Sequence, residues 1–160
     1  MKVNEVAISY LSQREVPNNM GFKDNAFEKK MIDVGFVKSY AWCALFMELC
    51  VKEGAPEFYK ANEKLFSASA TTTYKNFEIA KKVSAIPQVG CGVIWRHGSG
   101  WQGHAGIVIK VNADGTFETV EGNTNSSGGR EGIEVAKKVR KVKQPYQSNG
   151  LNLVGFLIFN

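Results

Sequence analysis

Four residues in the chain are of types that serve in nucleophilic catalysis: Cys43, His104, Glu121 and Asn123. A cysteine attacks as its thiolate, and a neighbouring imidazolium stabilises that thiolate before the imidazole moves protons as a general base and acid. The other nitrogen of the imidazole needs a carboxylate or an amide oxygen that fixes its orientation. These types therefore indicate a cysteine nucleophile with a histidine base, provided that the fold brings them together.

Cys43 is expected in the first turn of a helix. Apolar residues run almost without interruption from Tyr40 to Val51, Ser39 is a suitable N-cap, and Gly-Ala-Pro at 54–56 ends the helix. Unpaired N–H groups and the helix dipole at that position stabilise a thiolate. The alternative is a small buried hydrophobe, because free cysteines are among the most buried residue types.

The segment that carries His104 is predicted to form a β-hairpin. Two β-branched runs, 104–111 and 116–120, flank the sequence NADG at 112–115, which is typical of a tight turn. In a two-residue turn Asn112 pairs with Gly115, and this pairing fixes the register of both strands.

That register brings the remaining candidates together. His104 would lie opposite Asn123, and Gly106 opposite Glu121, so that Glu121 and Asn123 share a face with the imidazole at roughly 5–7 Å. Either residue could then orient the ring. A one-residue bulge would change the register, so the prediction depends on its absence.

The order of the elements predicts an α+β domain. Residues 3–11 and 26–34 have the spacing of amphipathic helices, as residues 74–83 do more loosely. After Pro87, glycines separate short β-branched runs that predict five strands, at 93–95, 104–111, 116–120, 132–142 and 151–159. Helices followed by strands favour N-terminal helices packed on an antiparallel sheet, in one domain over residues 1–160.

Composition narrows the class of protein. The chain has 160 residues, 44% hydrophobic and 22% charged, which suits one soluble globular domain. No run approaches the roughly 20 apolar residues of a membrane span, and residues 1–5 lack the apolar core of a signal peptide. The net charge of +5 favours anionic partners or merely aids solubility. No nucleic-acid-binding pattern accompanies it, so we expect none.

The cysteines and histidines do not predict a metal or a disulfide. Cys43, Cys50 and Cys91 are odd in number and irregularly spaced. Cys43 and Cys50 would lie about 10 Å apart along one helix, too far for a bridge. There is no CxxC pair, and His97 lies in a loop without an acidic partner. We therefore expect no metal and no cofactor.

Three ordered motifs resemble those of the CHAP domain: AWCALF at 41–46, GHAGIV at 103–108 and EGNTN at 121–125. CHAP domains are cysteine- and histidine-dependent amidohydrolases and peptidases with a papain-like α+β fold, and they cleave amide bonds in bacterial peptidoglycan. REVPNN at 14–19 and GGREG at 128–132 are similar to segments of the phage-endolysin-like branch. The chain departs from the family at 90–92, where Gly-Cys-Gly replaces the usual Gly-Asp pair.

The resemblance implies a role for each candidate. Cys43 would be the nucleophile, His104 the general base, and Glu121 the residue that orients His104. Asn123 would orient the imidazole or assist the oxyanion. The substrate-binding candidates are Trp42, Trp95, Trp101 and Arg130.

Among these, Trp42 fits the core better, and Trp101, in a Gly/Ser-rich loop, fits the substrate better. The basic segment 137–143 is expected to be a solvated or edge-protecting strand, with binding to wall polymers as the alternative.

The implied function is a peptidoglycan hydrolase, either an N-acetylmuramoyl-L-alanine amidase or a peptide-stem endopeptidase. The protein would be a monomer, made in the cytoplasm without a signal peptide and without stable membrane insertion. It would reach the periplasm or cell wall in one of two ways. A phage or prophage endolysin would reach the wall after holin release. An antibacterial effector would be delivered by a secretion system and would have an immunity protein. The alternatives are a cysteine peptidase or transferase acting on a protein, and an inactive wall-binding module.

Overall fold

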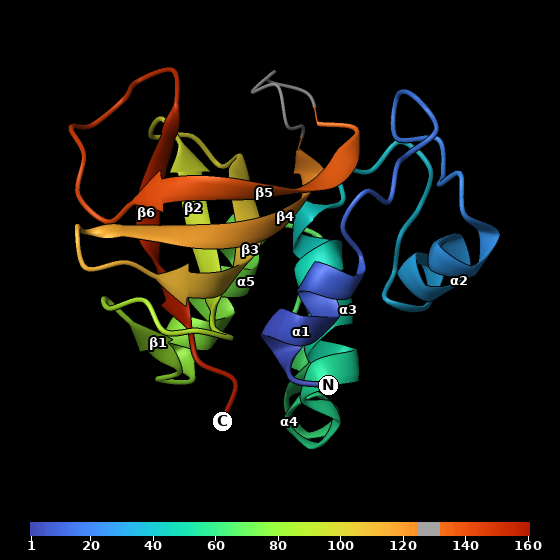
Figure 1. Cartoon of the computed structure of the whole chain (residues 1–160), viewed down its shortest axis with the longest axis horizontal. Helices are drawn as coiled ribbons and strands as arrows, with labels where there is room; N and C mark the ends of the chain where they lie inside the picture. Colours follow the sequence, from blue (N-terminus) through green and yellow to red (C-terminus); the bar gives the residue numbers. More distant parts are fainter. Residues whose placement is uncertain (125–131) are drawn as a thin grey trace.

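The computed structural model describes residues 1–124 and 132–160. Figure 1 shows helices gathered against one side of a strongly curled sheet. The helices are α1 (Val3–Ser9), α2 (Asn25–Asp33), α3 (Cys43–Gly54), α4 (Pro56–Asn62) and α5 (Ala70–Ile79), with a 3₁₀ turn at Glu63–Leu65. The strands are β1 (Val83–Ser84), β2 (Gly92–His97), β3 (Gly103–Val111), β4 (Thr116–Thr124), β5 (Glu134–Lys141) and β6 (Leu151–Leu157).

The predicted α+β class with an antiparallel sheet is confirmed, and the arrangement is consistent with a papain-like fold. The described sheet has six strands in the order β1-β6-β2-β3-β4-β5, not five. The additional strand, β1, begins at Val83, a residue that the sequence analysis placed in a helix. That helix, α5, lies earlier, because the Ser69 side chain caps its N-terminus by accepting a hydrogen bond from the Thr72 N–H at 3.2 Å.

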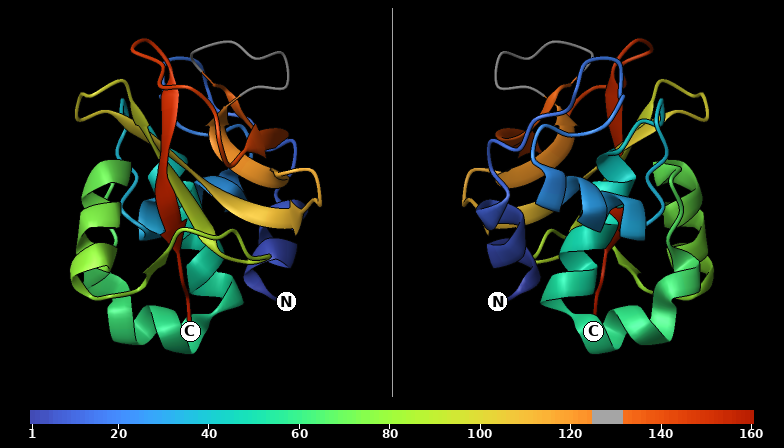
Figure 2. Two further views of the ribbon diagram at one scale, coloured as in Figure 1. Left: turned by 90° about the vertical axis from the view of Figure 1, so that its left-hand side faces the viewer. Right: turned by 90° about the vertical axis from the view of Figure 1, so that its right-hand side faces the viewer.

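Helix α3 is the central element of the helical layer. Figure 2 shows it between α1 and α5 in the layer that packs on the sheet, and both α1 and α3 contact β3 and β4. Every residue from Cys43 to Val51 is buried, as an almost continuous apolar run predicts. The helix ends at Gly54, and Pro56 begins α4, where its fixed φ suits the first helical turn. No helix in the described part of the chain is long and apolar enough to span a bilayer.

The start of α3 differs from the prediction. Ser39 is not its N-cap: this residue has a φ of 78°, and its N–H donates to the Asn19 carbonyl at 2.7 Å. Residues 39–41 therefore belong to the loop before the helix, and Trp42 occupies the N-cap position. Cys43 is the first helical residue, so the thiol lies closer to the unpaired N–H groups than expected.

The hairpin of β3 and β4 also differs locally from the prediction. Asn112 pairs with Thr116 rather than Gly115, because the turn has three residues and Gly115 adopts a φ of 84°. A register shift follows between Val108 and Lys110. The extra residue in the turn and this bulge compensate each other, so Ile107 pairs with Val120 as predicted.

The head of α3 packs closely on the end of β4. A Cβ atom at Gly122 would lie 2.7 Å from the Phe46 Cβ and 2.7 Å from the Trp42 Cζ3. These distances are too short for non-bonded carbon atoms, so only glycine permits the approach. Gly122 therefore sets how near the first turn of the helix comes to the sheet.

We expect Gly122→Ala to lower the free energy of unfolding by about 1–3 kcal/mol, because the added methyl group overpacks this contact. Urea denaturation would measure the change. Gly100→Ala is the matched control, since its nearest neighbour would be the His97 carbonyl oxygen at 3.6 Å. Equal stability of the two variants would contradict the close packing.

Candidate active site

Cys43 is the first residue of α3, and its side chain is almost fully enclosed, with 5% of the residue exposed. Burial raises the pKa of the thiol, whereas the His104 side chain and the backbone N–H groups of Ala105 and Ala44 lower it. Ala44 belongs to the first turn of the helix, and Ala105 to β3. The paired part of β3 and β4 begins at Ile107, so the thiol meets β3 just beyond the hairpin ladder.

His104 lies on β3 opposite Trp95 of β2, and 12% of its side chain is exposed. Its Nε2 atom is 2.9 Å from Oε2 of Glu121. Since the carboxylate occupies Nε2, Nδ1 is the ring nitrogen left to serve Cys43. The ring therefore joins the thiol and the carboxylate, one at each nitrogen.

Glu121 lies on β4 and is completely buried. Besides His104, it accepts hydrogen bonds from the Thr119 hydroxyl at 2.8 Å and from two atoms of Arg140 on β5. The Arg140 Nε atom lies 2.8 Å from Oε1, and Nη2 lies 2.6 Å from Oε2. This two-point contact, with all acceptor sites directed at donors, compensates for the loss of water around the carboxylate.

These contacts set the charges of the site. Burial disfavours the carboxylate, but the charges and hydrogen bonds of His104 and Arg140 lower the pKa of Glu121 to about 2. Burial likewise opposes the imidazolium, but Glu121 and Cys43 raise the pKa of His104 to about 10. At neutral pH the site therefore holds a carboxylate beside an imidazolium.

Cys43 differs from the other two cysteines. Burial raises the pKa of Cys50 well above its ordinary value and that of Cys91 to about 11. Burial acts on Cys43 too, but the hydrogen bond and the positive charge of His104 outweigh it and lower the pKa of Cys43. The thiolate can attack a carbonyl carbon, and the imidazolium can then protonate the leaving group.

The other sequence-based candidates lie in different surroundings. Asn123 follows on β4 with a φ of 52°, and the hydrogen bond that orients His104 comes from Glu121. Trp42 and Trp95 are 0% and 2% exposed, so both are packing residues, and the prediction that they bind substrate is not supported. Trp101 is 76% exposed and remains the candidate for substrate contact. Arg130, with the segment GGREG, lies outside the described residues.

Two residues of the site were not predicted from the sequence. Arg140 and Thr119 both bind Glu121, yet Arg140 was assigned to a solvated basic strand. Val139 is 67% exposed, while Arg140 points inward. The pairing of Phe117 with Arg140 would have placed the arginine on the face of Glu121, but the sequence alone does not fix the register of β5.

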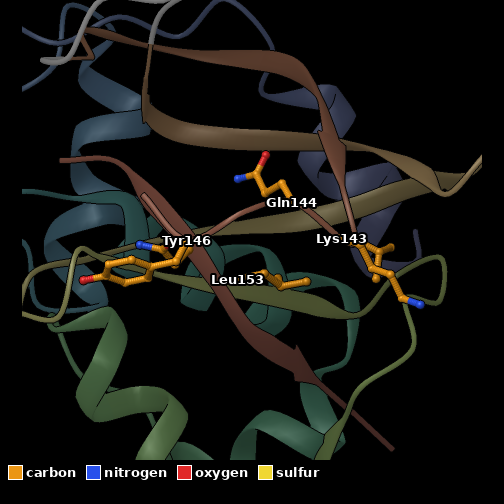
Figure 3. Close-up of a pocket in the computed structure, with 6 residues that line it drawn as sticks. Lys143, Gln144, Tyr146 and Leu153 are labelled. Carbon is orange, nitrogen blue, oxygen red and sulfur yellow. The ribbon is translucent and has the colours of Figure 1, made fainter. Parts of the chain in front are cut away.

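Two hollows on the described surface do not contain these residues. One is lined by Asn25, Ala26, Glu28 and Lys29 on α2. The other, of about 390 Å³, lies beside β6, where Figure 3 shows Lys143, Gln144, Tyr146 and Leu153 around it. Neither hollow brings a nucleophile and a base together. The candidate active site is therefore the one formed around Cys43.

The described residues contain no cluster of three or more His, Cys, Asp or Glu that could hold a metal ion. Asp24 is the N-cap of α2. It accepts hydrogen bonds from the N–H groups of Ala26 and Phe27.

Comparison with known proteins adds one finding. The family model of the CHAP domain matches residues 35–123, which is more than half of the chain and includes Cys43, His104 and Glu121. The chain belongs to the CHAP-domain family. Members of this family are typically amidases or peptidases that act on peptidoglycan. No curated protein and no solved structure matches the chain significantly.

The electrostatics of this CHAP domain predict how Cys43 reacts with iodoacetamide. Its alkylation rate should be half-maximal below the ordinary thiol value of about pH 8.5, because the His104 imidazolium favours the thiolate. In His104→Gln the midpoint should move upward, since burial then acts without that charge. Rates at several pH values, with the label located by mass spectrometry, would measure both midpoints.

His97→Gln is the control, and we expect its midpoint to match that of the unaltered protein. Equal midpoints in His104→Gln and the unaltered protein would contradict the proposed ion pair.

Proposed function

We propose that the protein is a peptidoglycan hydrolase that cleaves an amide bond through Cys43, His104 and Glu121. The single observation that carries the proposal is the chain of contacts from the Cys43 sulfur through His104 to the buried Glu121 carboxylate. It supplies a nucleophile, a proton donor and an orienting group in the order that acyl transfer requires. Membership of the CHAP family gives the class of substrate.

The reaction would proceed in two halves. The Cys43 thiolate adds to the amide carbonyl carbon, and the His104 imidazolium protonates the nitrogen as the carbon–nitrogen bond breaks. This leaves a thioester on Cys43 and a neutral imidazole. His104 then removes a proton from water as the water attacks the thioester, and loss of the thiolate restores the ion pair.

Glu121 would contribute without touching the substrate. Its bond to Nε2 keeps Nδ1 facing Cys43 through both halves of the reaction. Its negative charge favours the imidazolium that must be present before attack and again after deacylation. Arg140 and Thr119 hold the Glu121 carboxylate in place. The imidazole that is bonded to this carboxylate therefore keeps its orientation.

Trp101 is the best placed of the predicted substrate contacts. Its carbonyl oxygen accepts a hydrogen bond from Thr71 of α5 at 2.8 Å, so the backbone is held while the indole stays in solvent. It precedes His104 by three residues on the segment leading into β3. An exposed indole there could pack on a sugar ring or on the peptide stem.

The bond would be either the N-acetylmuramoyl-L-alanine amide or an amide within the peptide stem. The setting would be phage or prophage lysis after holin release, or delivery as an antibacterial effector with a cognate immunity protein. In both settings the protein acts in the periplasm or cell wall. The net charge of +5 supports attraction to anionic wall polymers.

We expect Cys43→Ala to lose lytic activity on purified peptidoglycan by at least about 1,000-fold, because the nucleophile is removed. The matched control is Cys91→Ala, which removes a cysteine that packs with Val93 and Trp95 in a separate cluster. Circular dichroism should show both variants folded. Turbidity of sacculi would measure lysis.

Mass analysis of the products would identify the new amine and carboxylate, and so the bond. Lysis by Cys43→Ala at the rate of the unaltered protein would refute the mechanism. Cleavage of protein substrates but not of sacculi would favour the alternative of a protein-directed peptidase.

A further inference from the structure

Four side chains, one of them the His104 imidazole, form a closed circuit of contacts. His104 bonds Glu121, Glu121 bonds Arg140, the Arg140 guanidinium lies 4.8 Å from the centre of the Trp95 ring, and Trp95 stacks on His104 with ring centroids 5.7 Å apart. These four side chains come from β2, β3, β4 and β5, so their contacts connect four neighbouring strands. Of the four, Arg140 lies farthest in sequence from the motifs at 41–46, 103–108 and 121–125.

We propose that Arg140 is a positioning residue of the active site, which fixes Glu121 and Trp95 around His104 and balances the charge buried there. This inference rests on the proposed function, because it assumes that His104 serves Cys43. The geometric evidence is the two-point contact with Glu121 together with the stacking over Trp95. A planar guanidinium can make both contacts at once, and a lysine ammonium cannot.

Trp95 stacks against one face of the His104 imidazole. Its indole lies nearly parallel to the His104 ring, at 30°, and its other neighbours include Phe117 at 6.4 Å. Only 2% of Trp95 is exposed, so it has little room to move. Arg140 contacts both supports of the histidine, the carboxylate and the indole, and therefore limits both rotation and tilt of the ring.

The charges of the site favour the same role. With a thiolate on Cys43, the buried groups carry two negative charges, on Cys43 and Glu121, and one positive charge, on His104. Arg140, whose side chain is 25% exposed, adds the second positive charge and makes the cluster neutral. Without it, a net negative charge would remain in a region of low dielectric, and the thiolate would become less favourable.

In the described part of the chain, the groups hydrogen-bonded to Glu121 are His104 on β3, Arg140 on β5 and the uncharged Thr119 on β4, with Cys43 on α3 beyond His104. Lys138 of β5 lies opposite Thr119 and is a further charged residue on this face. Arg140 is thus the ionised partner of Glu121 whose charge does not change during the reaction.

Two substitutions separate charge from geometry. Arg140→Gln removes the charge, and we expect the midpoint of Cys43 alkylation to rise by about one pH unit, a tenfold loss of rate at a fixed lower pH. Arg140→Lys keeps the charge but loses the fork and the stacking. Its alkylation midpoint should stay near that of the unaltered protein, while kcat on peptidoglycan falls about tenfold with little change in KM.

Lys141→Gln is the matched control, because it removes the same charge from the neighbouring, exposed position of β5 and should change neither quantity. An unshifted midpoint in Arg140→Gln would overturn the charge-balancing role. An unchanged kcat in Arg140→Lys would overturn the positioning role, and this test remains if Arg140→Gln fails to fold. Because alkylation needs no substrate, a protein that fails to lyse sacculi still tests the role of Arg140.

Discussion

The hydrogen bond between Glu121 and His104 is the interaction on which the rest of the site depends. A buried imidazole on its own would be neutral, because burial opposes its charge. The carboxylate reverses this preference and occupies Nε2, so that Nδ1 faces Cys43. The thiolate in turn depends on the imidazolium, since burial alone would leave Cys43 protonated like Cys50. The ionisation state of Cys43 on α3 is thus set by Glu121 on β4, through His104 on β3.

The fold makes room for this arrangement at considerable cost. A fully buried carboxylate that lost its cationic partners would destabilise the protein by about 3–5 kcal/mol. Four donor contacts offset that cost, and the missing side chain at Gly106 allows the Glu121 Cγ to approach within 2.8 Å of the position a Cβ would take. On the helical side, Gly122 lets the head of α3 close in. Gly106 thus makes room for the carboxylate, and Gly122 makes room for the helix that carries Cys43.

Much of this could be predicted from the sequence, because the decisive patterns are local. The apolar run after Cys43 predicted a buried helix, and the alternation around NADG predicted a hairpin that joins His104 to Glu121. The register next to the site, with Ile107 opposite Val120, was correct although the turn was not: a three-residue turn and a bulge each shift the pairing by one, in opposite directions. Neither irregularity has a strong sequence pattern, so their compensation could not have been predicted.

The unpredicted parts are those that depend on long-range pairing. Arg140 lies on an edge strand in which valines and basic residues do not alternate regularly, so its inward face is fixed only by pairing with β4. Trp95 was taken for a cleft residue because tryptophan favours both surfaces and cores, and only the sheet order shows that it lies beneath His104. Ser39 is a favourable cap by type, but the contact with Asn19 holds it in the preceding loop.

The central claim is that His104 is an imidazolium in the resting protein, and nuclear magnetic resonance can test it directly. The chain has two histidines, so a His97→Gln variant labelled with ¹⁵N leaves the ring of His104 alone in the spectrum. We predict that both ring nitrogens stay protonated well above neutral pH, with a midpoint near the value of about 10 to which Glu121 and Cys43 raise the pKa of His104. A midpoint at the ordinary histidine value of about 6.5 would contradict it.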